Sequence, residues 1–367
     1  MTFTTTPPSL PELPELPELS ERLWEVAIGR DEPAAMRLVT AAADAGADPE
    51  ALLLDVVAGV QHRIGVEWAA ARISVADEHA ASAITDRVLA ALAHHRAPRQ
   101  QHTRGRVTVA CAEGEWHVLP ARLLAEVLTH RGWQVDFLGG HTPTPHLVAH
   151  VHQTNPTAVL LSASLPTRLP AAHNAISALQ SIGVPVLAGG RAFGPDGRYA
   201  HALGVDAWAP DAREAATLLD QGPAQHHAGQ RRQVVDDLPH LTDQEYTQVT
   251  TRRTALVKQS LEALDARWPA MRTYSTAQRD RTTEDLAHIV DFLAAALYVD
   301  DAELFTTFTT WTAGILSARG VPAAGLLLGL DVLAGQLRDF PRALTFLKTA
   351  ADSLQSRSDH TSPGITA

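Results

Sequence analysis

The fold is decided by the stretch Val107-Thr108-Val109-Ala110-Cys111-Ala112-Glu113-Gly114-Glu115-Trp116-His117. Its first five residues are small, apolar or β-branched, which is typical of a buried strand, and the turn residues after them end that strand. The segment that follows, 119–131, has helical periodicity. The chain therefore passes from a strand, through a loop with charged and aromatic side chains, into a helix.

The same alternation continues downstream. Short apolar runs predict strands at 134–138, 158–162, 184–188 and 207–209, and helices are predicted between them at 145–153 and 168–181. Alternation of this kind predicts right-handed crossovers and a Rossmann-like, doubly wound parallel sheet. Ligands of such sheets bind beyond the carboxyl ends of the strands, where the loop that carries Glu115 and His117 begins.

The segments on either side of the sheet domain show only helical periodicity. The first predicts about four helices, enough for a small bundle, and the fold class is therefore multidomain α and α/β. Residues 7–19 are Pro-Pro-Ser-Leu followed by three Pro-Glu-Leu units, a low-complexity run that predicts a disordered tail. The predicted organisation is a tail at 1–19, a four-helix bundle at 20–97, a Rossmann-like domain at 104–222, a linker at 223–238, an all-α domain at 239–356 and a disordered tail at 357–367.

Composition excludes several classes of protein. No apolar run approaches the length of a membrane span, and the N-terminus lacks a basic start followed by an apolar stretch, so we expect a soluble, cytoplasmic protein without a membrane partner. The net charge of -11 argues against a nucleic-acid partner. With Cys111 as the only cysteine, neither an intrachain disulfide nor a thiolate metal cluster can form.

Four segments occur in order within the predicted sheet domain: Gly114-Glu115-Trp116-His117, Leu138-Gly139-Gly140, Leu161-Ser162-Ala163-Ser164 and Ala188-Gly189-Gly190. Together they resemble cobalamin-binding domains of the base-off, histidine-on type. The resemblance implies that His117 supplies the lower axial nitrogen to cobalt and that Glu115 accepts the other ring N–H, which fixes the imidazole tautomer. The implied contacts of the buried cofactor tail are Ser162, Ser164, Gly189 and Gly190.

Each of these pieces has an ordinary interpretation when it is taken alone. A histidine in a strand-to-helix loop is usually a plain polar residue, and glycines after strands usually form turns. The sequence also departs from the family motif at Pro120, which stands where the motif has its final glycine. A proline there would crowd the cofactor tail, unless Pro120 simply begins the following helix, where proline is well tolerated.

The predicted bundle carries a second pattern, in which Trp68 is followed after nine residues by Glu78-His79. This pattern resembles the bundle of CarH-type cobalamin photoreceptors. The resemblance implies that Trp68 covers the adenosyl group of adenosylcobalamin and that Glu78 and His79 line its pocket. In the other interpretation, Trp68 belongs to the bundle core and Glu78-His79 to a solvated helix face. Ala69 stands where those regulators have a histidine that takes the upper cobalt site after photolysis, so that step does not carry over.

The C-terminal helical segment resembles the corresponding domain of photocobilins, which combine a cobalamin domain with a bilin, normally biliverdin. Forked arginines could pair with the propionates, and a histidine or carboxylate could meet the pyrrole N–H groups. The candidate bilin contacts are Arg281, His288, Asp291 and Arg319. In the plainer interpretation, Phe292, Phe305, Phe308 and Trp311 form a core and the charges lie on the surface. Because Cys111 lies in a predicted strand, we expect the bilin to be bound non-covalently.

These resemblances imply a photoreceptor rather than an enzyme. Light would break the cobalt–carbon bond of adenosylcobalamin and change how chains associate, giving a light-dependent homo-oligomer that signals to a separate downstream protein. The rival hypothesis is a corrinoid methyl-carrier protein of a methyltransferase system, in which His117 would serve equally well. A third hypothesis is a cobalamin-dependent assembly factor without photochemistry.

Overall fold

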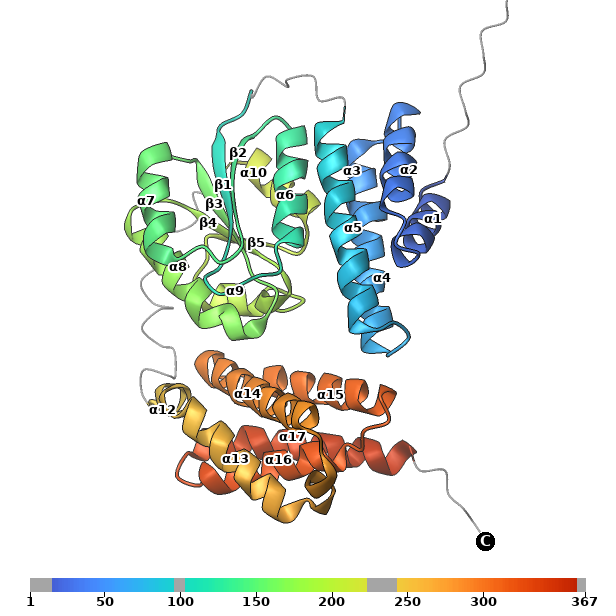
Figure 1. Ribbon diagram of the computed structural model, residues 1–367. Helices are drawn as coiled ribbons and strands as arrows, with labels where there is room; N and C mark the ends of the chain where they lie inside the picture. Colours follow the sequence, from blue (N-terminus) through green and yellow to red (C-terminus); the bar gives the residue numbers. More distant parts are fainter. Residues whose placement is uncertain (1–14, 96–102, 223–242, 362–367) are drawn as a thin grey trace, which may run out of the picture. The chain divides into compact units, whose positions relative to one another are not determined.

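In the computed structural model, the described residues are 15–95, 103–222 and 243–361 (Figure 1). They belong to two compact units. One unit runs up to Val109 and includes Val118–Phe137, and the other holds Ala110–His117 and the chain from Leu138 onward. The loop that carries Glu115 and His117 therefore belongs to the same unit as the C-terminal helices.

The first unit begins with the predicted four-helix bundle, which confirms this part of the fold class. Its third helix contains one π-helical segment, η1, between two α-helical parts. Side chains cap the helices: Asp31 accepts from the backbone N–H of Ala34, and Ser74 and Asp77 form a capping box. The helices are α1 (Leu16–Ile28), α2 (Glu32–Asp44), α3 (Pro49–Ala51) continued by η1 (Leu52–Val57) and α4 (Ala58–Ala69), and α5 (Val75–His94).

Two predicted boundaries differ from the structure. Helix α1 begins at Leu16, inside the tail predicted for 1–19, because Pro17 falls in the first turn, where proline is tolerated. Leu19 and Leu23 are then spaced to bury one face. At the other end, α17 (Pro341–Thr361) continues past the predicted start of the tail at 357. The remaining tail residues, 1–14 and 362–367, and the whole predicted linker, 223–238, lie outside the described residues.

The sheet has five strands in the order β2-β1-β3-β4-β5, and β4 pairs in parallel with both β3 and β5. This order confirms the predicted Rossmann-like, doubly wound fold. The direction of winding changes between β1 and β3, so the crevice beyond their carboxyl ends is the expected ligand site. The strands are β1 (Arg106–Cys111), β2 (Gln134–Gly139), β3 (Ala158–Ser162), β4 (Val186–Gly189) and β5 (Ala207–Ala209). The longer helices of this domain are α6 (Leu119–His130), α7 (Thr144–Thr154), α8 (Leu169–Ser181) and α10 (Ala212–Asp220).

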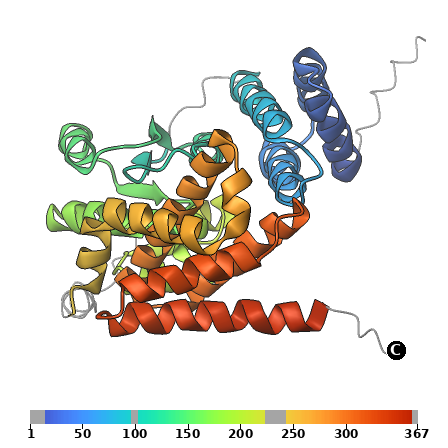
Figure 2. The same cartoon turned by 60° about the horizontal axis from the view of Figure 1, so that its bottom comes forward.

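The C-terminal helices, coloured yellow to red in Figures 1 and 2, form the predicted all-α domain. Their apolar side chains join those of the second unit's sheet residues and α8 in one continuous core. Helix α14 packs against α8 and against the short helix η2 (Pro166–Arg168). The helices are α12 (Glu245–Thr251), α13 (Arg253–Arg267), η6 (Pro269–Thr273), α14 (Thr276–Val299), α15 (Ala302–Ala318), α16 (Ala324–Gln336) and α17.

Polar contacts also join the sheet domain to the C-terminal helices within the second unit. The ring of His173 on α8 lies 2.6 Å from the hydroxyl of Tyr298 on α14, and both side chains are buried. The Tyr199 hydroxyl on α9 (Arg198–Ala202) donates to Asp301 Oδ2 at 2.8 Å, and burial raises the pKa of Tyr199, so this hydroxyl remains a donor. Arg198 also donates to Glu303 at 2.8 Å. The sheet domain and the C-terminal helices of this unit are therefore joined by both apolar and polar contacts.

Cys111 ends β1 with its side chain fully buried. Burial, and to a smaller extent the nearby Glu115 carboxylate, raise the pKa of the thiol to about 12. The thiol therefore stays protonated at neutral pH, and thiolate is the reactive form.

Within the described ranges, none of the helices is both long and apolar enough to span a bilayer.

Candidate functional site

Glu115 and His117 form the centre of the site. The Glu115 carboxylate is fully buried, and its Oε1 atom accepts from the His117 backbone N–H at 2.8 Å and lies 2.6 Å from His117 Nδ1. Its Oε2 atom accepts from the backbone N–H groups of Ser164 at 2.7 Å and Leu165 at 3.1 Å. A carboxylate at Nδ1 favours the tautomer with its proton there and leaves Nε2 as the nitrogen for a metal.

The pKa of Glu115 reflects two opposing effects. Burial raises the pKa of the carboxyl group, but hydrogen bonds from the His117 side chain and from the backbone of His117 and Ser164 outweigh it, and the pKa falls from 4.5 to about 2. Glu115 is therefore an anion at neutral pH. A buried anion beside an imidazole raises the basicity of that ring, as a metal-ligating histidine requires.

The loop between β1 and α6 is tied to the loop after β2 by His141. His141 Nδ1 accepts from the Gly114 backbone N–H at 2.9 Å, and the His141 N–H donates to the Glu115 carbonyl at 2.8 Å. Trp116 stacks on the His141 ring with 5.0 Å between ring centroids and 6° between planes. The sequence prediction assigned no role to Trp116 or His141; the aromatic residue beside the predicted ligand was the one signal that could have drawn attention to this pair.

The predicted tail-binding residues lie where the neighbouring strands β3 and β4 end, because Ser162 pairs with Gly189 in the parallel register. Gly190 has φ +102°, and a Cβ atom there would stand 2.3 Å from the carbonyl oxygen of Ala163. Glycine at 190 is therefore required by the close approach of this chain's own backbone. Ser162 is buried, and Ser164 contributes the backbone N–H that binds Glu115.

Pro120 lies in the first turn of α6 and is exposed. Proline is tolerated at this position because the first N–H groups of a helix have no partner within the helix. The local structure thus agrees with the plainer of the two explanations for this departure from the motif.

The bundle residues occupy the ends of two consecutive helices. Trp68 is half-buried near the end of α4, and Glu78 and His79 lie in the first two turns of α5. Glu78 accepts from the Ser82 hydroxyl at 2.9 Å and lies 2.5 Å from His79 Nδ1, and the His79 side chain is 74% exposed. Trp68 is therefore partly accessible rather than wholly enclosed in the core.

The four candidate bilin residues come from two elements, three from α14 and one from the end of α15. Arg281 and His288 are exposed on α14, seven positions apart and so on one helix face. Asp291 receives two hydrogen bonds from Arg253, at 2.5 and 2.8 Å. Arg319 follows α15 and donates to the carbonyl of Ile315 at 3.2 Å.

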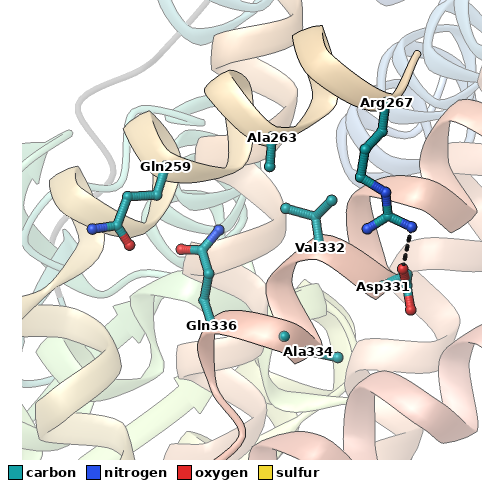
Figure 3. A pocket seen from close by; sticks show the side chains of 8 residues that line it. Gln259, Ala263, Arg267, Asp331, Val332, Ala334 and Gln336 are labelled. Carbon is teal, nitrogen blue, oxygen red and sulfur yellow. Dashed lines mark hydrogen bonds and ion pairs between the residues drawn. The ribbon is translucent and has the colours of Figure 1, made fainter.

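A groove of about 350 Å³ lies between α13 and α16 (Figure 3). An ion pair between Arg267 and Asp331, 2.7 Å long, closes one end, and Gln336 donates to the Ser260 hydroxyl at 2.9 Å. The groove is lined by Gln259, Ala263, Arg267, Asp331, Val332, Ala334, Gly335 and Gln336, a set that includes none of the four candidate bilin residues.

Comparisons with known proteins identify the cofactor class. Residues 105–218 match the family model described as the B12 binding domain, and residues 19–93 match a second model of the same description. The chain is therefore a cobalamin-binding protein, with a helical and a Rossmann-like B12 binding domain in sequence. No curated protein matches the chain.

Three of the solved structures that are similar to this chain contain corrinoid or cobalamin-binding proteins. The monomethylamine corrinoid protein of Methanosarcina barkeri is 20% identical with a TM-score of 0.49, over 56% of this chain and 98% of that one. The methanol:cobalamin methyltransferase complex of M. barkeri is 21% identical with a TM-score of 0.31, over 60% and 85%. A cobalamin-binding protein of Desulfitobacterium hafniense DCB-2 is 20% identical with a TM-score of 0.31, over 55% and 97%.

Proposed function

We propose that this chain is a light-sensing photoreceptor that binds adenosylcobalamin base-off with His117 as the lower cobalt ligand, and that also binds biliverdin non-covalently. The observation that carries the cobalamin part is the contact between the buried Glu115 carboxylate and His117 Nδ1. The residues present fit the cofactor, because this contact leaves an imidazole nitrogen for cobalt on a ring that is 58% exposed.

The chain's own residues divide the work. Glu115 orients the His117 ring, and Trp68 excludes water from the upper ligand, with Glu78 and His79 at the polar rim of that pocket. When bound, adenosylcobalamin supplies a cobalt–carbon bond that green or blue light breaks. A change in what Trp68 packs against then alters the packing of α4 and α5, which shifts the association of chains toward another state and signals to a separate partner.

The C-terminal helices are proposed to hold the bilin. Arg281 and His288 share an exposed helix face, which suits a propionate and a polar edge of a tetrapyrrole, and Arg319 offers a second guanidinium. Asp291 would have to exchange Arg253 for pyrrole N–H groups. The buried, protonated Cys111 thiol supports non-covalent binding. The continuous core with α8 gives a physical route by which the two chromophore sites would influence each other.

A corrinoid methyl carrier is the second candidate, because the contact between Glu115 and His117 would serve it equally. The Trp68 and Glu78-His79 pattern and the C-terminal helices favour the photoreceptor. The two differ in what they bind and in what light does to them.

The deciding experiment reconstitutes the full chain in darkness with adenosylcobalamin and biliverdin. Absorption spectra and elution volumes are recorded before and after green light, with His117→Ala and a cyanocobalamin-loaded sample as controls. We expect a base-off, histidine-on spectrum and a red-absorbing bilin band. The elution volume should shift only in the illuminated adenosylcobalamin sample. Cobalamin binding without a bilin band or an elution shift would overturn the photoreceptor, and methyl exchange with a partner methyltransferase would then favour the carrier.

A further inference from the structure

Trp116 stands out on the surface of the sheet domain. The residue is 69% exposed, although it follows the fully buried Glu115. The His117 side chain, on its other side, is 58% exposed. The backbone therefore turns the acid inward and presents the indole and the imidazole together to solvent, and a large exposed aromatic group beside a ligand-binding side chain is typical of a binding anchor.

The indole is held in place although it is exposed. His141, on which it stacks, has φ +47°, a conformation that costs free energy for any residue with a side chain. Two hydrogen bonds hold His141 there, one from Gly114 to its ring and one from its backbone to Glu115. The same loop that positions His117 thus also positions the stacking partner of Trp116, so little side-chain freedom remains to be lost when the indole meets a ligand.

We propose that Trp116, ordered by His141, is a cofactor-binding residue that contacts the lower face of the corrin ring beside the axial histidine. A corrin is a broad, flat and largely apolar ring system, far wider than the spacing between adjacent side chains. A ring centred on His117 therefore covers the neighbouring exposed indole and removes its apolar surface from water. This inference rests on the proposed role of His117 as the cobalt ligand.

The test uses the full chain without cofactor, titrated in darkness with hydroxocobalamin. Absorption reports the base-off, histidine-on form, and tryptophan fluorescence reports contact with the corrin, which quenches it. The variants are Trp116→Ala, Trp116→Phe and His141→Ala. Trp311→Ala is the matched control, because Trp311 is also exposed, at 52%, but belongs to α15. Circular dichroism checks that each variant is folded.

We expect Trp116→Ala to weaken cobalamin binding about tenfold or more while the histidine-on spectrum is retained at saturation. Trp116→Phe should bind with intermediate affinity and lose much of the fluorescence quenching, and His141→Ala should weaken binding less than Trp116→Ala. Trp311→Ala should bind like the wild type.

Equal affinities and equal quenching in the wild type and the Trp116 variants would overturn the inference while leaving the proposed His117 site intact. A wild-type chain that binds cobalamin without the histidine-on spectrum would overturn both. If Trp116→Ala leaves cobalamin affinity unchanged but alters the elution volume, the indole serves a protein contact and the inference is wrong.

Discussion

Glu115 shows how one side chain can organise a whole loop. Its carboxylate takes part in hydrogen bonds with the backbone and ring of His117 and with the backbone of Ser164 and Leu165. All of these partners are donors toward an anion, and such charge-assisted bonds are stronger than neutral ones. The loop after β1 and the loop after β3 are thus fixed by the same group that orients the candidate cobalt ligand.

Replacement of Glu115 by glutamine should therefore harm both binding and stability. The Glu115→Gln amide keeps the size of the side chain but turns N–H donors toward donors of the backbone. We expect cobalamin affinity to fall about 10- to 100-fold and the free energy of unfolding to fall by about 1–3 kcal/mol. Absorption titration and urea unfolding measure the two effects. Glu113→Gln is the matched control, and an equal loss in that variant would count against the assignment.

Gly190 offers a second test at the scale of one residue. In Gly190→Ala the new Cβ would meet the Ala163 carbonyl at 2.3 Å in a backbone with φ +102°, whereas at Gly183, with φ +80°, it would meet nothing within 4 Å. We expect Gly183→Ala to cost about 1–2 kcal/mol from the backbone conformation alone. Gly190→Ala should cost several kcal/mol in all. Thermal and urea unfolding compare them, and similar costs would show that the loop after β3 can move away.

The sequence could predict the contact between Glu115 and His117, but not the contacts that hold the surrounding loop in place. The contact between Glu115 and His117 was implied by the resemblance to cobalamin-binding domains, and the structure shows it. The role of His141 could not be predicted, since it depends on a left-handed backbone conformation and on a contact with Gly114, 27 positions away. The contact of Gly190 with the cofactor tail stays a prediction, and the close approach that the structure shows at Gly190 is that of the Ala163 backbone.

At the scale of one element, helix α5 begins with a capping box just before Glu78 and His79, the residues proposed to line the adenosyl pocket. Ser74 accepts from the Asp77 backbone at 3.1 Å, and Asp77 accepts in return from the Ser74 backbone at 3.1 Å. This reciprocal cap satisfies N–H groups that the helix itself cannot satisfy. It also sets the turn at which Glu78 and His79 emerge.

Loss of this cap should be measurable in the stability of the bundle and in its dependence on pH. We expect Ser74→Ala to reduce the free energy of unfolding by about 1 kcal/mol.

The hydrogen bond from Ser74 and then that from Arg30 lower the pKa of Asp77 from 3.8 to about 2. The contribution of Asp77 to the stability of the folded state is therefore complete above pH 3.8 and is lost as the pH falls through about 2. The free energies of unfolding of the wild type and Asp77→Asn should therefore differ at pH 6 and converge in acid. Unfolding followed by circular dichroism measures both. A constant difference across this range would contradict the assignment, and Ser181→Ala is the control for removal of an exposed hydroxyl.

Element positions followed from pattern, because burial imposes a period of two or 3.6 residues on the sequence. The predicted strand at 158–162 matches β3, and the predicted helix at 168–181 begins one residue before α8. The π-helical turn η1, Leu52–Val57, was not predicted, since the same apolar spacing suits an α-helix. Local pattern also gave no sign that α1 would begin within the Pro-Glu-Leu repeat.

At the scale of the whole second unit, the buried contact between His173 and Tyr298 joins two segments that lie 125 positions apart. Tyr298 also packs edge-on against the Tyr246 ring of α12. Burial raises the pKa of Tyr298, so its hydroxyl stays protonated and available for this hydrogen bond. Periodicity could predict each helix, but not which helix of the C-terminal domain would share a core with α8.

We expect Tyr298→Phe to lower the free energy of unfolding by about 1–3 kcal/mol, because it leaves a buried ring nitrogen of His173 without this partner. Hydrogen exchange provides the more specific readout. In the wild type, cobalamin should slow exchange in α14 as well as in α8, and in Tyr298→Phe the protection of α14 should diminish while that of α8 persists. Tyr274→Phe removes a hydroxyl elsewhere in the same domain and serves as control. Protection confined to α8 in the wild type would show that the shared core does not couple the two domains.

The burial of Cys111 has a practical consequence. A chain whose single native thiol is enclosed in β1 and protonated at neutral pH should ignore maleimide and methanethiosulfonate reagents while it remains folded. A cysteine introduced at an exposed position such as Trp311 would then take a spin label or fluorophore alone, without removal of the native residue. With two such labels on one chain, the distance between them could be measured in darkness and after illumination.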